Sequence, residues 1–387
     1  MRNGIILVVV KRIAIVERPH GGWTRDIILG LASYAEAMED WELRLFTPRE
    51  GVVSRVLAWE PHAIVANLIE RGLADGFALF PGPMINTSVP ECAPRIPLVG
   101  IDHQAIGAVA VAFFAERGFR HLHFVSSRHH PWWHGVGRGM VAASRRFDLI
   151  CSSIFLETPE SGERRWELAG WLKQQPGQLA VCADPELAVD LAAACRDLGR
   201  SVPGEVSILA SEDHELDCQM CVPPLSAIRL AGRQAGHHCG QMISALLRKV
   251  RFRRKILLSP LGIIERRSTG VTAIHDPLVR QALRLMQERA SDRLSVKELV
   301  GELSVSRRTL ENRCRATTGR SPLQLIARAR TERIKRALCQ TDQPIQAIAA
   351  RFGYPDPAQF AREFRRTAGE TAADYRRRSQ AALSEQH

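Results

Sequence analysis

The sequence lacks the features typical of membrane proteins and of disulfide-stabilised secreted proteins. No stretch holds 18 consecutive apolar residues without a charge, so no membrane-spanning helix is predicted. The opening "MRNGIILVVVKR" has a short apolar run but no small-residue cleavage site, and we expect a buried strand there instead of a signal peptide. The cysteines number nine, an odd count at scattered positions, which favours a reducing compartment.

Signatures of nucleotide chemistry and of common hydrolases are also missing. There is no GxxxxGK(S/T), and no GxGxxG follows a predicted strand, because "GVGRG" at Gly135–Gly139 has the wrong spacing. Neither GxSxG nor HExxH occurs. The single CxxC, Cys218 and Cys221, has no second pair to complete a four-ligand zinc site. We therefore predict no cofactor and no bound metal, and a nucleotide-dependent enzyme is disfavoured.

Positive charge is abundant and unevenly distributed. Residues 276–387 hold 22 Lys and Arg against 13 Asp and Glu, whereas residues 1–275 hold 31 against 28. At 45% hydrophobic and 24% charged residues the chain is globular, so this excess belongs to a folded C-terminal region. Concentrated positive charge suits a polyanion, most simply the phosphates of DNA, although a solvated helical surface would also be basic.

Short β-branched runs alternate with helical patterns over the first 270 residues. Strands are predicted at 12–17, 42–46, 62–68, 96–102, 121–127, 179–184 and 206–212, with clear helices at 24–38 and 104–118. This order implies parallel sheets with right-handed crossovers. Ligands of such sheets bind beyond the carboxyl ends of the strands. The segments "RPHGGWTR", "SSRHHPWWHGVGR" and "SEDHE" lie at those ends.

Carboxylates and aromatic rings in these segments are candidates for ligand contact. Glu212 and Asp213 lie at the carboxyl end of a predicted strand, where a side chain would face a ligand. Trp132 and Trp133 either contact a ligand or pack in the core or between lobes.

Three neighbouring histidines, His129, His130 and His134, resemble a metal cluster on paper. They have no obvious acidic or cysteine partner as a fourth ligand, so a metal site there is disfavoured.

A domain boundary is predicted just after residue 270. The strand-like "LGIIERRST", Leu261–Thr269, is followed by Gly270, and Asp276–Pro277 opens a new helix. We expect a ligand-binding domain at 1–270, a linker at 271–276 and a DNA-binding domain at 277–382.

Two helix-turn-helix units are predicted in the last 110 residues. The first begins at a capping box, Ser295 and Glu298, flanked by the apolar pair Leu294 and Leu299. Its first helix ends before the turn "SVS", and its second helix, "RRTLENRCRATTG", ends at Gly319.

The second unit carries its own start and stop signals. The helix "QAIAARF" is closed by Gly353, which suits the left-handed residue after a helix. Asp356 is then an N-cap, Pro357 the first helical residue and Gln359 the third, and this last helix ends at Gly369.

The two units form an internal repeat with a period of 50 residues. Matching positions are Ser306 and Asp356, Leu310 and Phe360, Cys314 and Phe364, Arg315 and Arg365, Thr317 and Thr367, and Gly319 and Gly369. Caps, core and stop signals in one register are stronger evidence than a single motif. The helix between the units, "QLIARARTERIKRAL", has Leu325, Ile326, Ala329 and Ile334 as apolar positions and should fix the separation of the units.

The faces of the second helix in each unit indicate which residues meet DNA. Leu310 with Cys314, and Phe360 with Phe364, are four residues apart and point inward together. Arg can pair with guanine, Asn with adenine, and Glu can accept from cytosine, while Arg and Lys contact phosphates. The candidates are Arg307, Arg308, Glu311, Asn312 and Arg315 in the first unit, and Ala358, Gln359, Arg362, Arg365 and Arg366 in the second.

Several segments together resemble a known family. The chain resembles regulators of the LacI type, with two periplasmic-binding-protein-like lobes, through "WTRDIILGLASYA", "GIDHQAIG", "ERGFRH", "DHELDCQMCVPPLSAI" and "IIERRSTG". The last region is similar to the AraC-type DNA-binding domain through "PIQAIAARFGYPDPAQFAREFRRTAG" and "DYRRR". The combination is similar to the xylose-operon regulators.

The resemblance implies a monosaccharide in the cleft between the lobes, held by polar groups and covered by an aromatic ring. It places Trp23 and Arg25 after the first strand and Arg138 at a helix start beside the ligand. Glu212 stands where relatives carry Asp, with Asp213 as the nearby alternative. A longer carboxylate at this position changes which ligand fits.

For the DNA-binding end, the resemblance matches two sets of residues with base-reading positions: Arg308, Glu311 and Asn312, and Ala358, Gln359 and Arg362. The small side chains Ala358 and Ala361 favour Arg362 as the main base reader of the second unit. Cys314 replaces an aromatic residue of the family, and Ala372 its usual proline.

The predicted function is a sequence-specific transcription regulator of sugar-utilisation genes that responds to a sugar such as xylose and is not an enzyme. The resemblance implies double-stranded DNA, a small sugar and RNA polymerase as partners, a homodimer, no membrane, and a cytoplasmic protein on the nucleoid. Two alternatives stay open: a sugar-acting enzyme fused to a DNA-binding domain, and a ligand-independent architectural DNA binder. The sugar, the operator and the sign of regulation are not given by the sequence.

Overall fold

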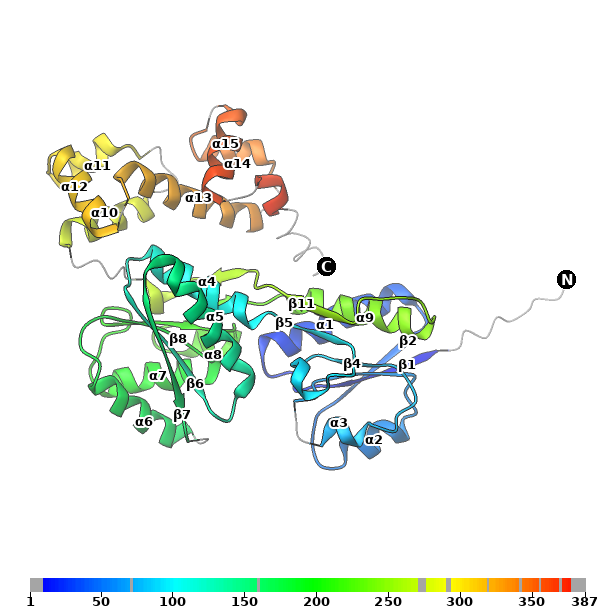
Figure 1. The fold of residues 1–387 in the computed structure, drawn as a ribbon. Helices are drawn as coiled ribbons and strands as arrows, with labels where there is room; N and C mark the ends of the chain where they lie inside the picture. The colour runs from blue at the N-terminus through cyan, green and yellow to red at the C-terminus, as the bar shows by residue number, and fades with distance from the viewer. Residues whose placement is uncertain are drawn as a thin grey trace. The chain divides into compact units, whose positions relative to one another are not determined.

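The computed structural model describes residues 10–69, 72–158, 161–270, 276–289, 294–318, 320–340, 343–354, 356–368 and 371–376 (Figure 1). The chain divides into two compact units, one of residues 1–112 and 121–270 and the other of residues 113–120 and 271–387. Most of the linker predicted at 271–276, the helix stops Gly319 and Gly369, and the predicted end at 382 lie outside the described residues. Within the described part, no helix combines the length and apolarity needed to cross a bilayer.

The first unit contains two six-stranded sheets. The first sheet has the order β11-β5-β4-β3-β1-β2, and every pairing in it is parallel. Its strands are β1 (Lys11–Val16), β2 (Trp41–Phe46), β3 (Ala63–Ala66), β4 (Met84–Asn86), β5 (Leu98–Ile101) and β11 (Lys255–Leu258). The helices between these strands, with the one before β11, are α1 (Gly22–Met38), α2 (Val52–Ala58), α3 (Leu73–Gly76) and α9 (Gly232–Leu247).

The second sheet has the order β12-β10-β9-β8-β6-β7, parallel except where β12 joins it. Its strands are β6 (His121–Ser127), β7 (Ile150–Leu156), β8 (Leu179–Ala183), β9 (Val206–Ala210), β10 (Ser226–Arg229) and β12 (Gly262–Ile264). The chain enters this sheet after α4 (His103–Glu116), and its own helices are α5 (His134–Ser144), α6 (Ser161–Lys173), α7 (Pro185–Asp197) and α8 (Glu215–Met220).

The fold is thus a two-lobed α/β domain followed by helices. The strand–helix alternation predicted the parallel sheets, and the family resemblance implied the two lobes. The seven predicted strands are present. Six of them are largely buried apolar runs of the kind that parallel sheets require, whereas β2, at the edge of its sheet, buries only Phe46. Strands β4, β7, β10 and β11 were not predicted, since they are short or carry serines and lysine. The strand expected over 261–269 covers only Gly262–Ile264, because the chain turns into a 3-10 helix at Arg267–Thr269.

Helices α1 and α9 pack almost backbone to backbone. A Cβ atom on Gly30 would lie 2.1 Å from the carbonyl oxygen of Arg233, and one on Gly236 would lie 2.2 Å from that of Ile27. Only glycine permits this approach.

The C-terminal unit has two small helical cores. Its helices are α10 (Pro277–Glu288), α11 (Val296–Leu303), α12 (Arg307–Thr318), α13 (Pro322–Gln340), α14 (Ile345–Arg351) and α15 (Pro357–Ala368). Leu299, Leu310 and Cys314 lie in the first core, and Phe360 and Phe364 lie in the second. Helix α13 contributes Leu325 and Ile326 to the first core and Ile334 and Leu338 to the second, so one continuous helix belongs to both. Of the positions predicted in this helix, Ala329 packs against the first core.

The predicted caps of the helix-turn-helix units are confirmed. Glu298 N–H donates to Ser295 Oγ at 3.2 Å and Ser295 N–H donates to Glu298 Oε2 at 2.8 Å, which makes a complete capping box. Asp356 accepts from the backbone N–H groups of Ala358 and Gln359 at 2.9 and 3.2 Å. Gly353 has φ 84°, the left-handed conformation expected after α14.

Candidate DNA interface and ligand site

Helix α12 presents a polar face opposite its buried one. Leu310 and Cys314 are fully buried. The predicted DNA-contacting residues Arg307, Arg308, Asn312 and Arg315 are exposed, and Glu311 is half-buried. Arg307 Nε donates to Glu311 Oε1 at 3.0 Å, so in this conformation that carboxylate is held by its own helix. The exposed set has the donors that base edges and phosphates accept.

Helix α15 repeats this arrangement. Phe360 and Phe364 are buried with ring centroids 5.7 Å apart. The predicted contact residues Ala358, Gln359, Arg362, Arg365 and Arg366 are all exposed. Among the described residues, none of the three arginines has a carboxylate within ion-pair distance. Their guanidinium groups are thus available to an anionic partner.

Trp23 and Glu212 meet at the carboxyl ends of the strands. The backbone N–H of Trp23, in the first turn of α1, donates to Glu212 Oε1 at 2.6 Å. The indole N–H of Trp23 donates to the carbonyl oxygen of Thr87 at 3.4 Å, and Thr87 Oγ1 donates to Glu17. Trp23 and Glu212 are each only 6% exposed. The carboxylate of Glu212 is therefore bound at the N-terminus of α1, where the helix dipole favours a negative charge.

Two glycines allow this contact. A Cβ atom on Gly22 would lie 2.4 Å from the carbonyl oxygen of Asp213, and one on Gly21 would lie 3.2 Å from Glu212 Oε1. The two glycines of the "HGGW" segment therefore allow the N-terminus of α1 to lie close to the segment after β9.

Asp213 has a different role from Glu212. Arg266 donates to both of its carboxylate oxygens, at 2.8 and 3.1 Å, and also to the carbonyl oxygen of Leu225. The two side chains are 13% and 14% exposed. Asp213, one of the two carboxylates predicted as ligand contacts, thus forms a bidentate ion pair with Arg266. Arg25, also predicted for the ligand, is exposed and lies 3.5 Å from Glu215.

His214 lies between two carboxylates. Its Nε2 is 3.6 Å from Glu212 Oε2 and its Nδ1 is 3.7 Å from Asp217 Oδ2, and the ring of His20 lies 6.1 Å away. Burial by itself would lower the pKa of His214, but the hydrogen bond and charge of Glu212, with the charge of Asp217, raise the pKa above 6.5. The protonated imidazole is thus the form that the fold favours.

This pair predicts a pH-dependent stability. Since the pKa of His214 is raised by folding, the pair stabilises the fold fully below about pH 6.5, and its contribution is lost as the pH rises through the folded value. Glu212→Gln keeps an oxygen for Trp23 N–H but removes the charge. We expect the melting temperature of Glu212→Gln to fall further below wild type at about pH 5.5 than at about pH 8.5. A difference in melting temperature that does not change with pH would contradict the pairing of Glu212 and His214. The control is Glu215→Gln, a substitution at an exposed position.

The tryptophans of the predicted ligand segment have different surroundings. Trp133 is 7% exposed and its ring lies edge-on to His103, with centroids 5.6 Å apart. Burial lowers the pKa of His103 to about 4, so this imidazole is neutral at neutral pH. Trp132 is half-buried, with its ring 4.9 Å from that of His130. Trp133 therefore packs as a core residue does, and Trp132 is the more accessible ring.

The three histidines predicted not to form a metal site point to separate partners. His129 Nε2 lies 2.8 Å from the carbonyl oxygen of Glu157, and His134 Nε2 lies 3.3 Å from that of Ser127. His130 Nδ1 lies 3.4 Å from Asp184. The described residues contain no group of three or more His, Cys, Asp or Glu side chains arranged to hold a metal. Burial raises the pKa of Cys218 to about 12 and also raises that of Cys221, so the CxxC thiols stay protonated.

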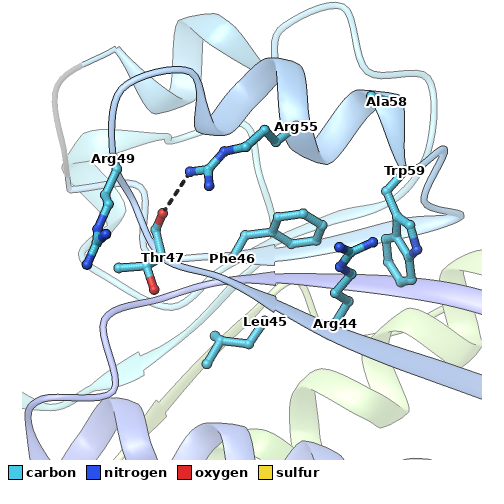
Figure 2. Close-up of a pocket in the computed structure, with 8 residues that line it drawn as sticks. All are labelled: Arg44, Leu45, Phe46, Thr47, Arg49, Arg55, Ala58 and Trp59. Carbon is cyan, nitrogen blue, oxygen red and sulfur yellow. Dashed lines mark hydrogen bonds between the residues drawn. The ribbon is translucent and has the colours of Figure 1, made fainter.

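Two open pockets lie in the first unit. The pocket in Figure 2, about 550 Å³, lies along β2 and α2 and is lined by Arg44, Leu45, Phe46, Thr47, Arg49, Arg55, Ala58 and Trp59. The guanidinium of Arg44 lies 5.3 Å from the ring of Phe46 and 5.8 Å from that of Trp59. The other, about 530 Å³, is lined by His134, Gly137, Arg138, Val141, Ala142, Arg145, Ser153 and Phe155. Arg138 is thus the predicted ligand residue that lines a pocket; Trp23 and Glu212 line neither.

Sequence reasoning did not single out four polar residues of this region. Glu17, Thr87 and Asp184 are buried and His103 is half-buried, and each follows a strand within two residues. Asp184 accepts hydrogen bonds from Ser126 Oγ and from the backbone of Leu187. Glu17 and Asp184 are the last residues of the strands predicted at 12–17 and 179–184, and His103 directly follows the strand predicted at 96–102. The ends of the predicted strands would thus have identified all but Thr87, whose strand has only three residues.

Comparison with known proteins agrees with this architecture. Residues 111–269 match the family described as a periplasmic binding protein-like domain, and residues 299–378 match a helix-turn-helix domain. The Xylose operon regulatory protein of Escherichia coli (strain K12) is 23% identical over 383 residues, covering 94% of this chain and 96% of that protein. A putative AraC-like transcription regulator of Streptomyces antibioticus is 34% identical over 110 residues, 28% of this chain and 36% of that protein.

Among solved structures, that of the xylose-binding transcription activator xylR aligns with a TM-score of 0.59 at 21% identity, covering 94% of this chain and 97% of that one. This likeness extends over both the two-lobed α/β domain and the helical unit. The chain therefore joins a periplasmic binding protein-like domain to an AraC-type helix-turn-helix domain and is homologous to the xylose operon regulatory proteins.

Proposed function

We propose that this protein is a transcription regulator that binds a specific DNA site through α12 and α15 and responds to a monosaccharide bound in its two-lobed domain. The observation that carries the DNA half is the repeated helix face. Two helices 50 residues apart in sequence seat apolar residues inward and turn arginine and amide side chains outward. A recognition helix reads base edges from its N-terminal part, so Arg308, Asn312 and Arg362 are the proposed base readers.

The sugar half rests on the polar groups at the strand ends and on the names of the relatives. Arg138 lines a pocket and offers N–H donors to the hydroxyl groups of a sugar. Trp132 offers an aromatic face to the apolar side of a sugar ring. A relative of known structure is described as xylose-binding, which makes a pentose the first ligand to test. A sugar that binds one arrangement of the lobes more tightly would shift the population toward it.

Several further properties belong to the same proposal. The protein would act as a regulator and not as an enzyme, because the Xylose operon regulatory protein and the AraC-like relative compared above are both named as regulators. Its partners would be double-stranded DNA in the cytoplasm, a second copy of the chain, and RNA polymerase.

A panel of monosaccharides, read by thermal shift and by operator affinity, tests the sugar half. We expect at least one pentose or hexose to raise the melting temperature and to change the affinity for DNA. If no sugar alters either quantity while specific DNA binding remains, the protein is a ligand-independent DNA binder. Product formation from any sugar would favour the enzyme alternative.

Replacing Arg362 by alanine tests the DNA half. An arginine that reads a base contributes about 1–3 kcal/mol of discrimination, so Arg362→Ala should lose that much affinity on the specific site and little on random DNA. Arg366→Ala, on the same helix one turn further from its N-terminus, is the matched control and should weaken both kinds of DNA equally. Equal losses on both for Arg362→Ala would make it a phosphate contact. Competition binding with operator and scrambled duplexes measures the difference.

A further inference from the structure

A dense cluster of positive charge lies outside the helix-turn-helix units. From the end of α9 to the first residue of β11, the segment "RKVRFRRK" carries six cations in eight residues and no carboxylate. They are Arg248, Lys249, Arg251, Arg253, Arg254 and Lys255. All six are exposed. We call residues 248–255 the basic loop.

The basic loop changes the charge balance of its whole domain. Residues 1–275 hold 31 Lys and Arg against 28 Asp and Glu, and the basic loop supplies six of those cations. Without it the region would carry more acidic than basic side chains. A solvated surface with mixed charges would not concentrate its excess in one loop, so this concentration points to an anionic partner.

The cations of the basic loop have no carboxylate partner in the part of the chain that the structure describes. In the described part of the chain, no carboxylate lies within ion-pair distance of any of the six, whereas Lys11, Arg12, Arg164, Arg165 and Arg266 elsewhere in this domain each have one. Unpaired exposed cations repel one another, and binding a polyanion relieves this repulsion and releases its counterions.

The backbone of the basic loop is held in place at both ends. After α9, the N–H of Val250 donates to the carbonyl oxygen of Ala245 at 2.9 Å, and Lys249 has φ 55°, the left-handed turn that ends many helices. Before β11, the carbonyl oxygen of Arg254 accepts from the N–H of Leu98 at 2.8 Å. The guanidinium of Arg254 donates to the carbonyl oxygen of Arg95, another exposed arginine, at 2.6 Å. The loop therefore presents its charges from a defined backbone.

From this geometry we infer that the basic loop is a second DNA-contacting surface, which binds phosphates of the duplex flanking the site read by α12 and α15. The inference rests on the proposed function, since a sequence-specific regulator is held on DNA long enough for a second patch to engage. Phosphate contacts carry no base preference, so the loop would add affinity and salt sensitivity without specificity.

The triple variant Arg248→Gln/Arg251→Gln/Arg253→Gln tests this inference in the full-length chain. It leaves Arg254, which holds the backbone of Arg95, in place. The dissociation constant for a duplex of about 60 base pairs is measured against salt concentration, and each lost phosphate contact reduces the slope of log K against log salt by about 0.9. We expect the slope to fall by about 2 to 3 on both operator and scrambled duplexes, with their affinity ratio unchanged.

A matched control separates local contact from net charge. Arg44→Gln/Arg49→Gln/Arg55→Gln removes the same charge from the pocket of Figure 2, beside β2 at the opposite edge of the same sheet from β11. This control should keep the wild-type slope. An equal change in both triple variants, or no change in the loop variant, would overturn the inference. Arg251→Glu, a single substitution, should repeat the direction of the loop effect and guards against misfolding of the triple variant.

The outcome for the loop is distinguishable from the outcome for the proposed function. If wild type binds operator and scrambled duplexes equally, sequence-specific regulation fails, while the slope on scrambled DNA still tests the loop. If wild type prefers the operator and the loop variant keeps the full slope, the proposed function stands and the loop inference is wrong.

Discussion

Replacing Phe364 by alanine is expected to destabilise the second helix-turn-helix unit by about 3–5 kcal/mol and to abolish operator binding. Phe364 is 2% exposed and packs against Phe360 and Tyr375, with centroids 5.7 and 6.1 Å away. The core around it is small, so little surrounding structure can collapse into the space left by the ring. A loss of this size is comparable to the whole free energy of unfolding of a small domain.

Calorimetry of the full-length chain measures this effect, together with operator binding. We expect the transition of the helical unit to move to lower temperature while that of the two-lobed domain stays in place. Ala361→Ser, on the exposed face of the same helix, should change stability by less than about 0.5 kcal/mol. Loss of binding by Phe364→Ala without any change in melting would instead make Phe364 a direct contact residue.

Replacing Arg266 by methionine is expected to destabilise the two-lobed domain by about 3 kcal/mol. The change leaves Asp213 largely buried without its partner, and removing one member of a buried ion pair costs more than the pair itself contributes. Both side chains retain slight exposure, 13% and 14%, so the lower end of the usual range applies. The substitution also removes the hydrogen bond that Arg266 donates to the carbonyl oxygen of Leu225.

The double variant Asp213→Asn/Arg266→Met separates the charge penalty from the lost packing. It should recover a large part of the stability lost in Arg266→Met, because no uncompensated charge remains. Chemical denaturation of the three variants gives the coupling energy. If Asp213→Asn abolished sugar binding without affecting stability, Asp213 would be a ligand contact and the structural role would be wrong.

Local signals in the sequence were sufficient for much of the helical unit. The capping box at Ser295, the N-cap at Asp356 and the left-handed Gly353 are short-range features, and each depends on residues within four positions. The repeat of 50 residues then identified the inward positions Leu310, Cys314, Phe360 and Phe364, all of which are buried.

The ligand region shows where sequence reasoning reaches its limit. Glu212 and Asp213 are neighbours with the same charge, and the sequence treated them as alternatives. The structure gives them opposite surroundings: Glu212 meets the N-terminus of α1, 189 residues away in sequence, and Asp213 pairs with Arg266, 53 residues away. Likewise, Trp132 and Trp133 could not be told apart until the fold buried one of them against His103.

The sequence by itself determined the α/β order of the first 270 residues, the repeated helix-turn-helix units and their outward-facing arginines, because periodicity and capping are encoded locally. Only the tertiary structure decided which carboxylate pairs with an arginine, which tryptophan is buried, and that no carboxylate among the described residues pairs with the cations of the basic loop. These depend on contacts between segments far apart in the chain, and a linear pattern does not record which distant groups meet.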